Sequence, residues 1–377
     1  MPDPTQHPHP HGRSQAEDPV LWLRLIRSRR IGPVTFHKVL AEHGGVEAAL
    51  AALPGIARAA GVEDYALCPV EVVRHEMAQA RAVGAKILLH GAKDYPGALM
   101  DLPDAPPILW VQGRAALLLE PAIALVGARN ASSLGLRMAR RLAMSLGAAG
   151  QVIVSGLARG IDAEAHQAAL ETGTIAVQAG GVDVIYPTEN AALAQAILEK
   201  GCRISEQPMG MQPQSRHFPL RNRIISGLSR AVVVVEAAER SGSLTTARDA
   251  LDQGREVLAV PGHPFDARAA GCNQLIRDGA VLVRSSADVL EALALPVLRE
   301  APDPVLEVPE VPRERRTLAE TGALHSQILA RLGPSPLAED QLIRDLDLPP
   351  ATVSGELLTL ELEGLIQRQA GGLLART

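Results

Sequence analysis

VIVSGLARGID, residues 152–162, joins a short apolar run to a helical pattern through a turn that contains serine and glycine. The same order recurs in AVVVVEAAERSGSLTTA, residues 231–247, where Ser241 and Gly242 precede the next helical pattern. Strands that are apolar throughout are buried on both faces, and their alternation with helices is typical of a parallel sheet with helices on both sides. The two stretches therefore predict an α/β fold.

This alternation of apolar runs and helical patterns extends from residue 86 to residue 293. The predicted strands are Lys86–Leu89, Ile108–Val111, Ile123–Val126, Val152–Val154, Thr174–Val177, Arg203–Ser205, Ala231–Val235, Val257–Val260 and Ala280–Val283. Helical patterns separate several of them. We therefore predict that residues 86–293 form an extended Rossmann-like core, a doubly wound and mostly parallel sheet.

The flanking residues predict four further segments. Residues 19–85 alternate helical patterns with Gly/Pro turns, which predicts a small helical domain similar to sterile-alpha-motif or helix-hairpin-helix units. Residues 319–377 contain three helical patterns and an apolar hairpin, which predict a winged helix. Residues 1–18 are polar and Pro-rich, as in a disordered tail, and residues 294–318 read as a Pro-rich linker. His7, His9 and His11 could bind a metal weakly, but we favour a solvated tail.

Composition narrows the class of protein. No apolar run approaches the about 18 residues that a membrane helix needs, so we expect no membrane partner. The three cysteines, Cys68, Cys202 and Cys272, form no CxxC pair. This argues against disulfides and structural zinc and favours a cytoplasmic protein.

The net charge of −5 does not exclude a nucleic-acid binder, because such a protein needs only a local basic surface. Residues 86–293 carry 20 basic and 20 acidic residues, whereas residues 319–377 carry 4 basic and 8 acidic ones. The acidic excess therefore lies mainly outside the core.

Glycine, serine and threonine gather where the predicted strands end. A glycine lets the backbone approach a ligand closely, and a helix N-terminus offers free N–H groups to an anion. The candidate contacts are Arg129 after Ile123–Val126, Ser155 and Gly156 after Val152–Val154, and Ser241, Gly242, Ser243 and Thr245 before the helix near residue 245. Since parallel strands end at one edge of the sheet, we expect a phosphate-binding rim there.

A cluster at residues 216–223 indicates which anion would bind. It combines Arg216, Arg221 and Arg223 with Asn222 and with Phe218, one of 3 phenylalanines in the chain. Bases stack on aromatic rings, and arginines neutralise phosphates. The cluster therefore predicts binding of single-stranded DNA; a buried phenylalanine with surface arginines is the alternative.

Asp162 and His166 lie four residues apart on one predicted helix. A catalytic or metal-binding pair is possible. We prefer a carboxylate stabilised by the helix dipole, with His166 as its hydrogen-bond partner. We therefore predict no catalytic residues, no metal site and no cofactor.

The core resembles the DprA (Smf) family in a series of motifs that follow one another in the family's order. They are Gly127-x-Arg129, SGLARGIDAEAH (155–166), TIAVQAGGVDVIYPTEN (174–190), SEQPMG (205–210), FPLRNRIISGLS (218–229), VVVEA with SGSLTTA (233–247), GREVLAVPG (254–262) and GCNQLIRDGA (271–280). The resemblance implies a dimeric DNA-processing protein of bacterial transformation that protects single-stranded DNA and loads the recombinase RecA. It implies that Arg129 is the leading phosphate contact and that residues 218–223 stack a base. Ala128 stands where the family usually has serine, which removes one hydroxyl donor.

Two alternatives differ from this interpretation. The core also resembles Rossmann-like phosphoribohydrolases, which use a PGGxGTxxE motif. The comparable stretch here, residues 241–247, does not fill the position of the glutamate, and Arg248 and Asp249 follow instead, so we do not expect an enzyme. The winged helix carries no Lys or Arg on its presumed recognition helix, so we expect a protein-contact or autoinhibitory role rather than duplex binding.

Overall fold

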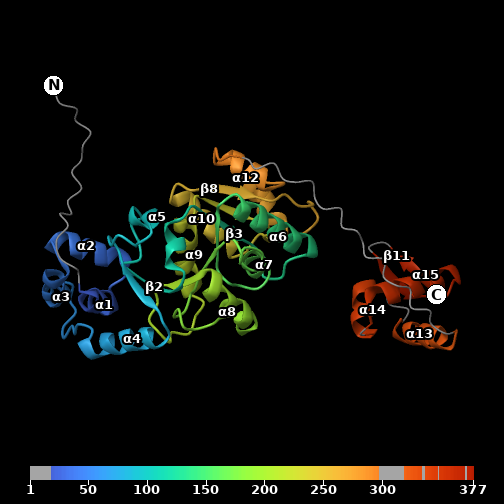
Figure 1. The fold of residues 1–377 in the computed structure, drawn as a ribbon, viewed down its shortest axis with the longest axis horizontal. Coiled ribbons are helices and arrows are strands. Elements are labelled where there is room, and N and C mark those ends of the chain that lie inside the picture. Colours follow the sequence, from blue (N-terminus) through green and yellow to red (C-terminus); the bar gives the residue numbers. More distant parts are fainter. Residues whose placement is uncertain (1–17, 297–317, 333–335, 347, 370–371) are drawn as a thin grey trace, which may run out of the picture. The chain divides into compact units, whose positions relative to one another are not determined.

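The computed structural model describes residues 18–296, 318–332, 336–346, 348–369 and 372–377. The chain forms two compact units, Met1–Glu300 and Ala301–Thr377, and each is described by itself (Figure 1). The predicted tail and linker lie almost wholly outside the described residues, and so do His7, His9 and His11.

Within the described residues, nine strands form one sheet in the order β1-β2-β6-β5-β4-β3-β7-β8-β9. Their bounds are β1 Lys86–Leu89, β2 Ile108–Gly113, β3 Ala122–Val126, β4 Val152–Ser155, β5 Thr174–Val177, β6 Cys202–Ser205, β7 Ala231–Val234, β8 Glu256–Ala259 and β9 Val281–Leu282. All pairs from β6 to β9 are parallel, whereas β2 is antiparallel to both β1 and β6. The predicted doubly wound, mostly parallel sheet is confirmed.

Helices cover both faces of this sheet because alternate strand residues point to opposite sides. Ile123 and Leu125 of β3 face α6 Ser133–Ala148, α7 Ile161–Ala168 and α12 Ser286–Ala292. Ala124 and Val126 face the side covered by α9 His217–Leu228, α10 Ser243–Asp252 and α11 Ala270–Arg277. The further helix α8, Ala191–Lys200, packs on Ala176 of β5 and contacts α7.

The strand order reverses between β3 and β7. From β3 the chain proceeds through β4 and β5 to β6 on one side, and β7, β8 and β9 then follow on the other side. Ligands of doubly wound sheets bind outside the carboxyl ends of the strands at such a reversal. The loops after β3, β4 and β7 therefore frame the expected site.

The N-terminal helices are α1 Pro19–Arg27, α2 Pro33–His43, α3 Val46–Ala59 and α4 Val70–Ala82. They lie beside β2 (Figure 1), and their apolar core, with Trp22 and Phe36, also includes Trp110 of β2. The buried Glu76 pairs with Arg27 at 2.8 Å and accepts a hydrogen bond from the Trp110 indole at 2.8 Å. The short elements α5 Gly97–Met100, η1 Ala115–Leu119 and η2 Thr188–Asn190 complete this unit.

The second unit has its own apolar core. Its elements are α13 Leu318–Arg331, β10 Leu337–Ala338, α14 Glu339–Leu346, α15 Pro350–Leu362, β11 Ile366–Gln369 and β12 Leu373–Arg376. Among the described residues its strands pair in the order β10-β12-β11. Three helices with a small antiparallel sheet confirm the winged helix. No helix in the part of the chain that the structure describes is long and apolar enough to cross a bilayer.

Candidate nucleic-acid interface

A cavity of about 400 Å³ lies at the carboxyl ends of β3 and β4. We call it the stacking pocket. Its lining residues are Arg129, Asn130, Gly156, Ala158, Arg159, Tyr186, Pro187 and Phe218. They come from the loops that follow β3, β4 and β5 and from the first turn of α9, so the predicted edge of the sheet does carry a pocket.

Two aromatic rings form one side of the stacking pocket. The ring centroids of Tyr186 and Phe218 lie 5.8 Å apart. Tyr186 is 48% exposed and Phe218 is half-buried, so both rings are held by the fold while part of each surface stays accessible. Exposed aromatic rings of this kind are platforms on which bases of any sequence stack.

Arg129 adds a positive charge to this aromatic side. Its guanidinium carbon lies 5.2 Å from the centroid of the Phe218 ring, a cation–π distance. The Arg129 side chain is exposed, and no carboxylate in the described part of the chain pairs with it. In contrast, Arg159 at the same pocket pairs with Glu189 at 2.6 Å. Arg129 is therefore the arginine of the pocket that is available to a phosphate.

The helix α9 begins at His217, and Pro219 lies in its first turn, where proline costs no hydrogen bond. Phe218 and Arg221 are three residues apart, so they share one side of the helix. The Arg221 guanidinium carbon lies 6.0 Å from the Phe218 centroid. The cluster at residues 216–223 is thus part of a helix where it meets the pocket. The geometry of this helix determines which of its arginines are exposed to solvent.

Arg221 lies beneath the pocket rather than on its rim. It donates hydrogen bonds of 2.6 Å to the carbonyl oxygens of Gly156 and Val177, and only 6% of the residue is exposed. A side chain at position 156 would overlap the Arg221 guanidinium, which explains the glycine. Arg221 therefore supports the β4 loop from below.

Burial lowers the pKa of Arg221 to about 10, and the nearby Arg129 also lowers it, while Asp162 acts in the opposite direction. The guanidinium still carries its proton at neutral pH. A guanidinium therefore lies under the floor of the pocket beside Asp162, whose carboxylate offsets part of its field toward a bound anion.

Asp162 and His166 both hold the loop after β4, but they do not bond to each other, which corrects the predicted partnership. The Asp162 carboxylate accepts hydrogen bonds from the N–H groups of Gly156 and Ala158 at 3.1 and 3.4 Å. Nε2 of His166 accepts one from the N–H of Leu157 at 3.3 Å. Burial lowers the pKa of His166 to about 3, with Arg221 contributing, so the ring is neutral.

Like Arg221, two further predicted contacts, Arg223 and Ser155, point into the protein instead of onto the rim. Arg223 is buried and pairs with Glu206 at 2.5 Å and with Asp104 at 3.3 Å. The Ser155 hydroxyl is buried and donates to the carbonyl of Leu125 at 2.6 Å. Both side chains are buried and bond to other protein groups instead of facing the solvent. The expectation that they face the rim is therefore corrected.

The remaining predicted residues lie around the pocket without lining it. Asn222 is buried and donates to the carbonyl of Gly242 at 3.4 Å, which connects α9 to the loop before α10. At the start of α10 the hydroxyl of Ser243 and that of Ser241, which lies in the preceding loop, hydrogen-bond to each other at 2.7 Å, and Thr245 in the first turn is half-buried. Arg216 is exposed just before α9. The structure thus brings Arg129, Gly156 and Phe218 together in the pocket.

Sequence reasoning missed five lining residues, namely Asn130, Ala158, Arg159, Tyr186 and Pro187. Tyr186 carried a usable signal, because the chain has only 3 tyrosines and this one follows a predicted strand. Arg159 stands in the same Gly-rich loop as Gly156. Both could have been found by extending the strand-end argument to the loop after β5 and to the whole loop after β4.

Family models match all three folded parts of the chain. Residues 86–294 match the model described as DNA recombination-mediator protein A. Residues 16–79 match a DprA-like N-terminal HHH domain, and residues 312–372 match a DprA winged helix domain.

Curated relatives and solved structures agree with these models. The chain is 40% identical over 283 residues to protein Smf of Escherichia coli, covering 74% of each chain. It is 44% identical over 220 residues to the DNA processing protein DprA of Bacillus subtilis, covering 58% of this chain and 74% of the relative. It resembles the crystal structure of DprA from Streptococcus pneumoniae with a TM-score of 0.55 at 34% identity, covering 70% of this chain and 98% of that one.

A structure of DprA from Helicobacter pylori, described as showing a unique single-stranded DNA binding mode, matches with a TM-score of 0.52 at 30% identity. That match covers 56% of this chain and 95% of the other. Together with the fold and the model that spans the whole core, these relatives establish the family. The chain belongs to the DNA recombination-mediator protein A (DprA/Smf) family.

Proposed function

We propose that this protein binds single-stranded DNA in the stacking pocket, protects incoming strands, and loads RecA onto them during transformation and recombination in the cytoplasm. The observation that carries the DNA-binding step is the unpaired, exposed Arg129 beside the Tyr186 and Phe218 rings. The DprA structure from Helicobacter pylori, which is described as showing a single-stranded DNA binding mode, supports the same ligand.

The chemistry of the pocket favours binding over catalysis. Asp162 and His166 would be the natural catalytic pair, but both are buried and occupied with the backbone of the β4 loop. Arginine and aromatic side chains give phosphate attraction and base stacking without a proton donor or acceptor poised for reaction. We therefore propose a binding protein that is not an enzyme.

The test is the affinity of the full chain for oligo-dT over a series of salt concentrations. We expect Arg129→Ala and Phe218→Ala each to weaken binding about tenfold, since stacking on one aromatic is worth about 1–3 kcal/mol. Arg129→Ala should also reduce the slope of log K against log salt by about 0.7, because one phosphate contact is lost.

Matched controls are available outside the stacking pocket. Phe265 is 93% exposed and lies outside the pocket, and Arg230 is exposed at the amino end of β7. Phe265→Ala and Arg230→Ala should bind oligo-dT like the wild type. Equal affinity of all four variants would show that DNA binds elsewhere.

We also propose that two copies of the chain pair through the Rossmann core. The last strand of the sheet, β9, exposes 38% of Val281 and 42% of Leu282, and an apolar edge strand is a ready site for pairing. Leu282→Glu should then shift the protein from dimer to monomer in analytical ultracentrifugation. A wild type that sediments as a monomer at micromolar concentration would contradict this dimer.

A further inference from the structure

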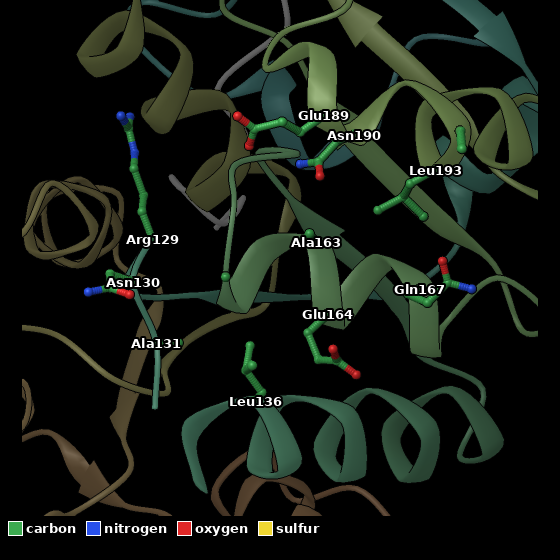
Figure 2. A pocket seen from close by; sticks show the side chains of 12 residues that line it. Arg129, Asn130, Ala131, Leu136, Ala163, Glu164, Gln167, Glu189, Asn190 and Leu193 are labelled. Carbon is green, nitrogen blue, oxygen red and sulfur yellow. The ribbon is translucent and has the colours of Figure 1, made fainter. Parts of the chain in front are cut away.

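A second cavity, of about 530 Å³, begins beside the stacking pocket and continues over α7. We call it the α7 groove. Figure 2 shows its side chains, which include Leu136 of α6, Ala163 and Gln167 of α7, and Leu193 of α8. Arg129 and Asn130 line both cavities, so the two sites meet at these residues.

The groove offers an apolar surface to a flat ligand. Figure 2 shows Leu136 and Leu193 on opposite sides of Ala163, whose small side chain leaves the middle of the groove open. The volume falls within the about 300–1,000 Å³ that is typical of small-ligand sites. Aliphatic walls of this kind accept the faces of a ring.

Polar groups stand at the ends of the groove. Asn130 and Gln167 are both exposed, and a side-chain amide can donate to and accept from the edge of a base. Asn190 is oriented by its own amide, which donates to the carbonyl of Leu157 at 2.9 Å. The groove thus combines an apolar middle with amides at its rim.

The charges of the groove do not suit a phosphate. Glu164 pairs with Arg140 at 2.5 Å, and Glu189 pairs with Arg159 at 2.6 Å. Of the described residues that line the groove, Arg129 is the only cationic one. Its side chain extends away from the groove (Figure 2), toward Phe218. A neutral ring fits inside, while a phosphate fits only at the Arg129 end.

We infer that the α7 groove is a second nucleobase site. It holds the base next to the one that stacks on Phe218, and Arg129 contacts the phosphate that connects the two nucleotides. This inference rests on the proposed function and adds that the protein engages two neighbouring bases on opposite sides of Arg129.

The experiment compares two oligonucleotides that have the same number of phosphates. One is oligo-dT, and in the other every second thymine is replaced by an abasic sugar, so that no register offers two neighbouring bases. The wild-type full chain should bind the alternating strand about tenfold more weakly than oligo-dT, as expected for the loss of one base contact.

Two groove variants, Ala163→Leu and Gln167→Ala, and one control variant, Ala148→Leu, test whether the groove causes that tenfold ratio. Ala163→Leu fills the middle of the groove and should bind both oligonucleotides with nearly equal affinity. Ala148→Leu places the same change at the exposed end of α6, outside both cavities, and should keep the wild-type ratio. Gln167→Ala is measured in parallel, because this exposed side chain is not needed for folding. It should reduce the ratio of the two oligonucleotide affinities about threefold.

The outcomes separate the two proposals. A wild type that binds both oligonucleotides equally, or Ala163→Leu and Gln167→Ala variants that keep the full ratio, would overturn the second base site while leaving the stacking pocket intact. If Arg129→Ala and Phe218→Ala leave the affinity for oligo-dT unchanged, the proposed function itself fails.

Discussion

The loop after β3 and the helix α9 each bring an arginine close to the ring of Phe218, yet the two arginines differ in what they can do. Arg129 lies 5.2 Å from the ring centroid and is exposed, whereas Arg221 lies 6.0 Å away and is almost fully buried. Arg221 donates hydrogen bonds to two backbone carbonyl oxygens. Proximity to an aromatic ring therefore does not identify a ligand contact, because the partners of the guanidinium decide its role.

The sharpest test of this difference is the stability of Arg221→Ala. The substitution leaves the carbonyls of Gly156 and Val177 without donors and removes a buried charge beside Asp162. We expect the free energy of unfolding to fall by about 3 kcal/mol in urea titrations. Arg129→Ala is the matched control and should change it by less than about 0.5 kcal/mol. An Arg221→Ala variant that keeps its stability but no longer binds DNA would show that Arg221 contacts the DNA directly. That result would contradict the difference in role between Arg129 and Arg221.

The free energy of unfolding should also depend on pH through His166, which holds the loop after β4. Its folded pKa is about 3, below its ordinary value of about 6.5. Protons therefore bind the unfolded chain preferentially, so the stability contributed by the neutral ring is present above pH 6.5 and is lost as the pH falls toward 3. We expect this group to lower the free energy of unfolding by about 2 kcal/mol between pH 7 and pH 5.

The measurement for His166 is the difference between the wild type and His166→Gln in urea unfolding at several pH values. Other groups titrate equally in both proteins, so the difference isolates the imidazole. The variant should be less stable at pH 7 but should lose less stability on acidification. If the free energies of unfolding of the two proteins change with pH in parallel, protonation of the buried imidazole does not destabilise the fold.

The smallest effect is expected from the winged helix. Residues 319–377 carry 4 basic and 8 acidic residues, and α15 exposes Leu358 and Leu362 instead of cations. We propose that this domain contacts proteins or restrains the core, so a chain that ends at residue 293 should bind oligo-dT with equal or moderately higher affinity. A large loss of affinity after truncation would assign DNA binding to this domain as well.

The sequence predicted most of the fold because the signals were local. The apolar runs at residues 174–177 and 86–89 match β5 and β1 in their bounds, and the other strands differ by one or two residues at their ends. Residues 217–228 were not assigned to a helix, since their basic and polar side chains hide the helical periodicity until Arg221 and Arg223 are known to be buried.

The sequence by itself determined the doubly wound sheet, the helical and winged-helix flanks, and Arg129 and Phe218 as candidate contacts, because strand ends and rare aromatics are visible in the chain. Only the tertiary structure decided that Tyr186 joins Phe218 and that Arg221, Arg223 and Ser155 point inward. The physical reason is that burial depends on neighbours distant in sequence. Gly156, Val177 and Glu206 are acceptors for the arginines of α9, and no local pattern shows that they are close.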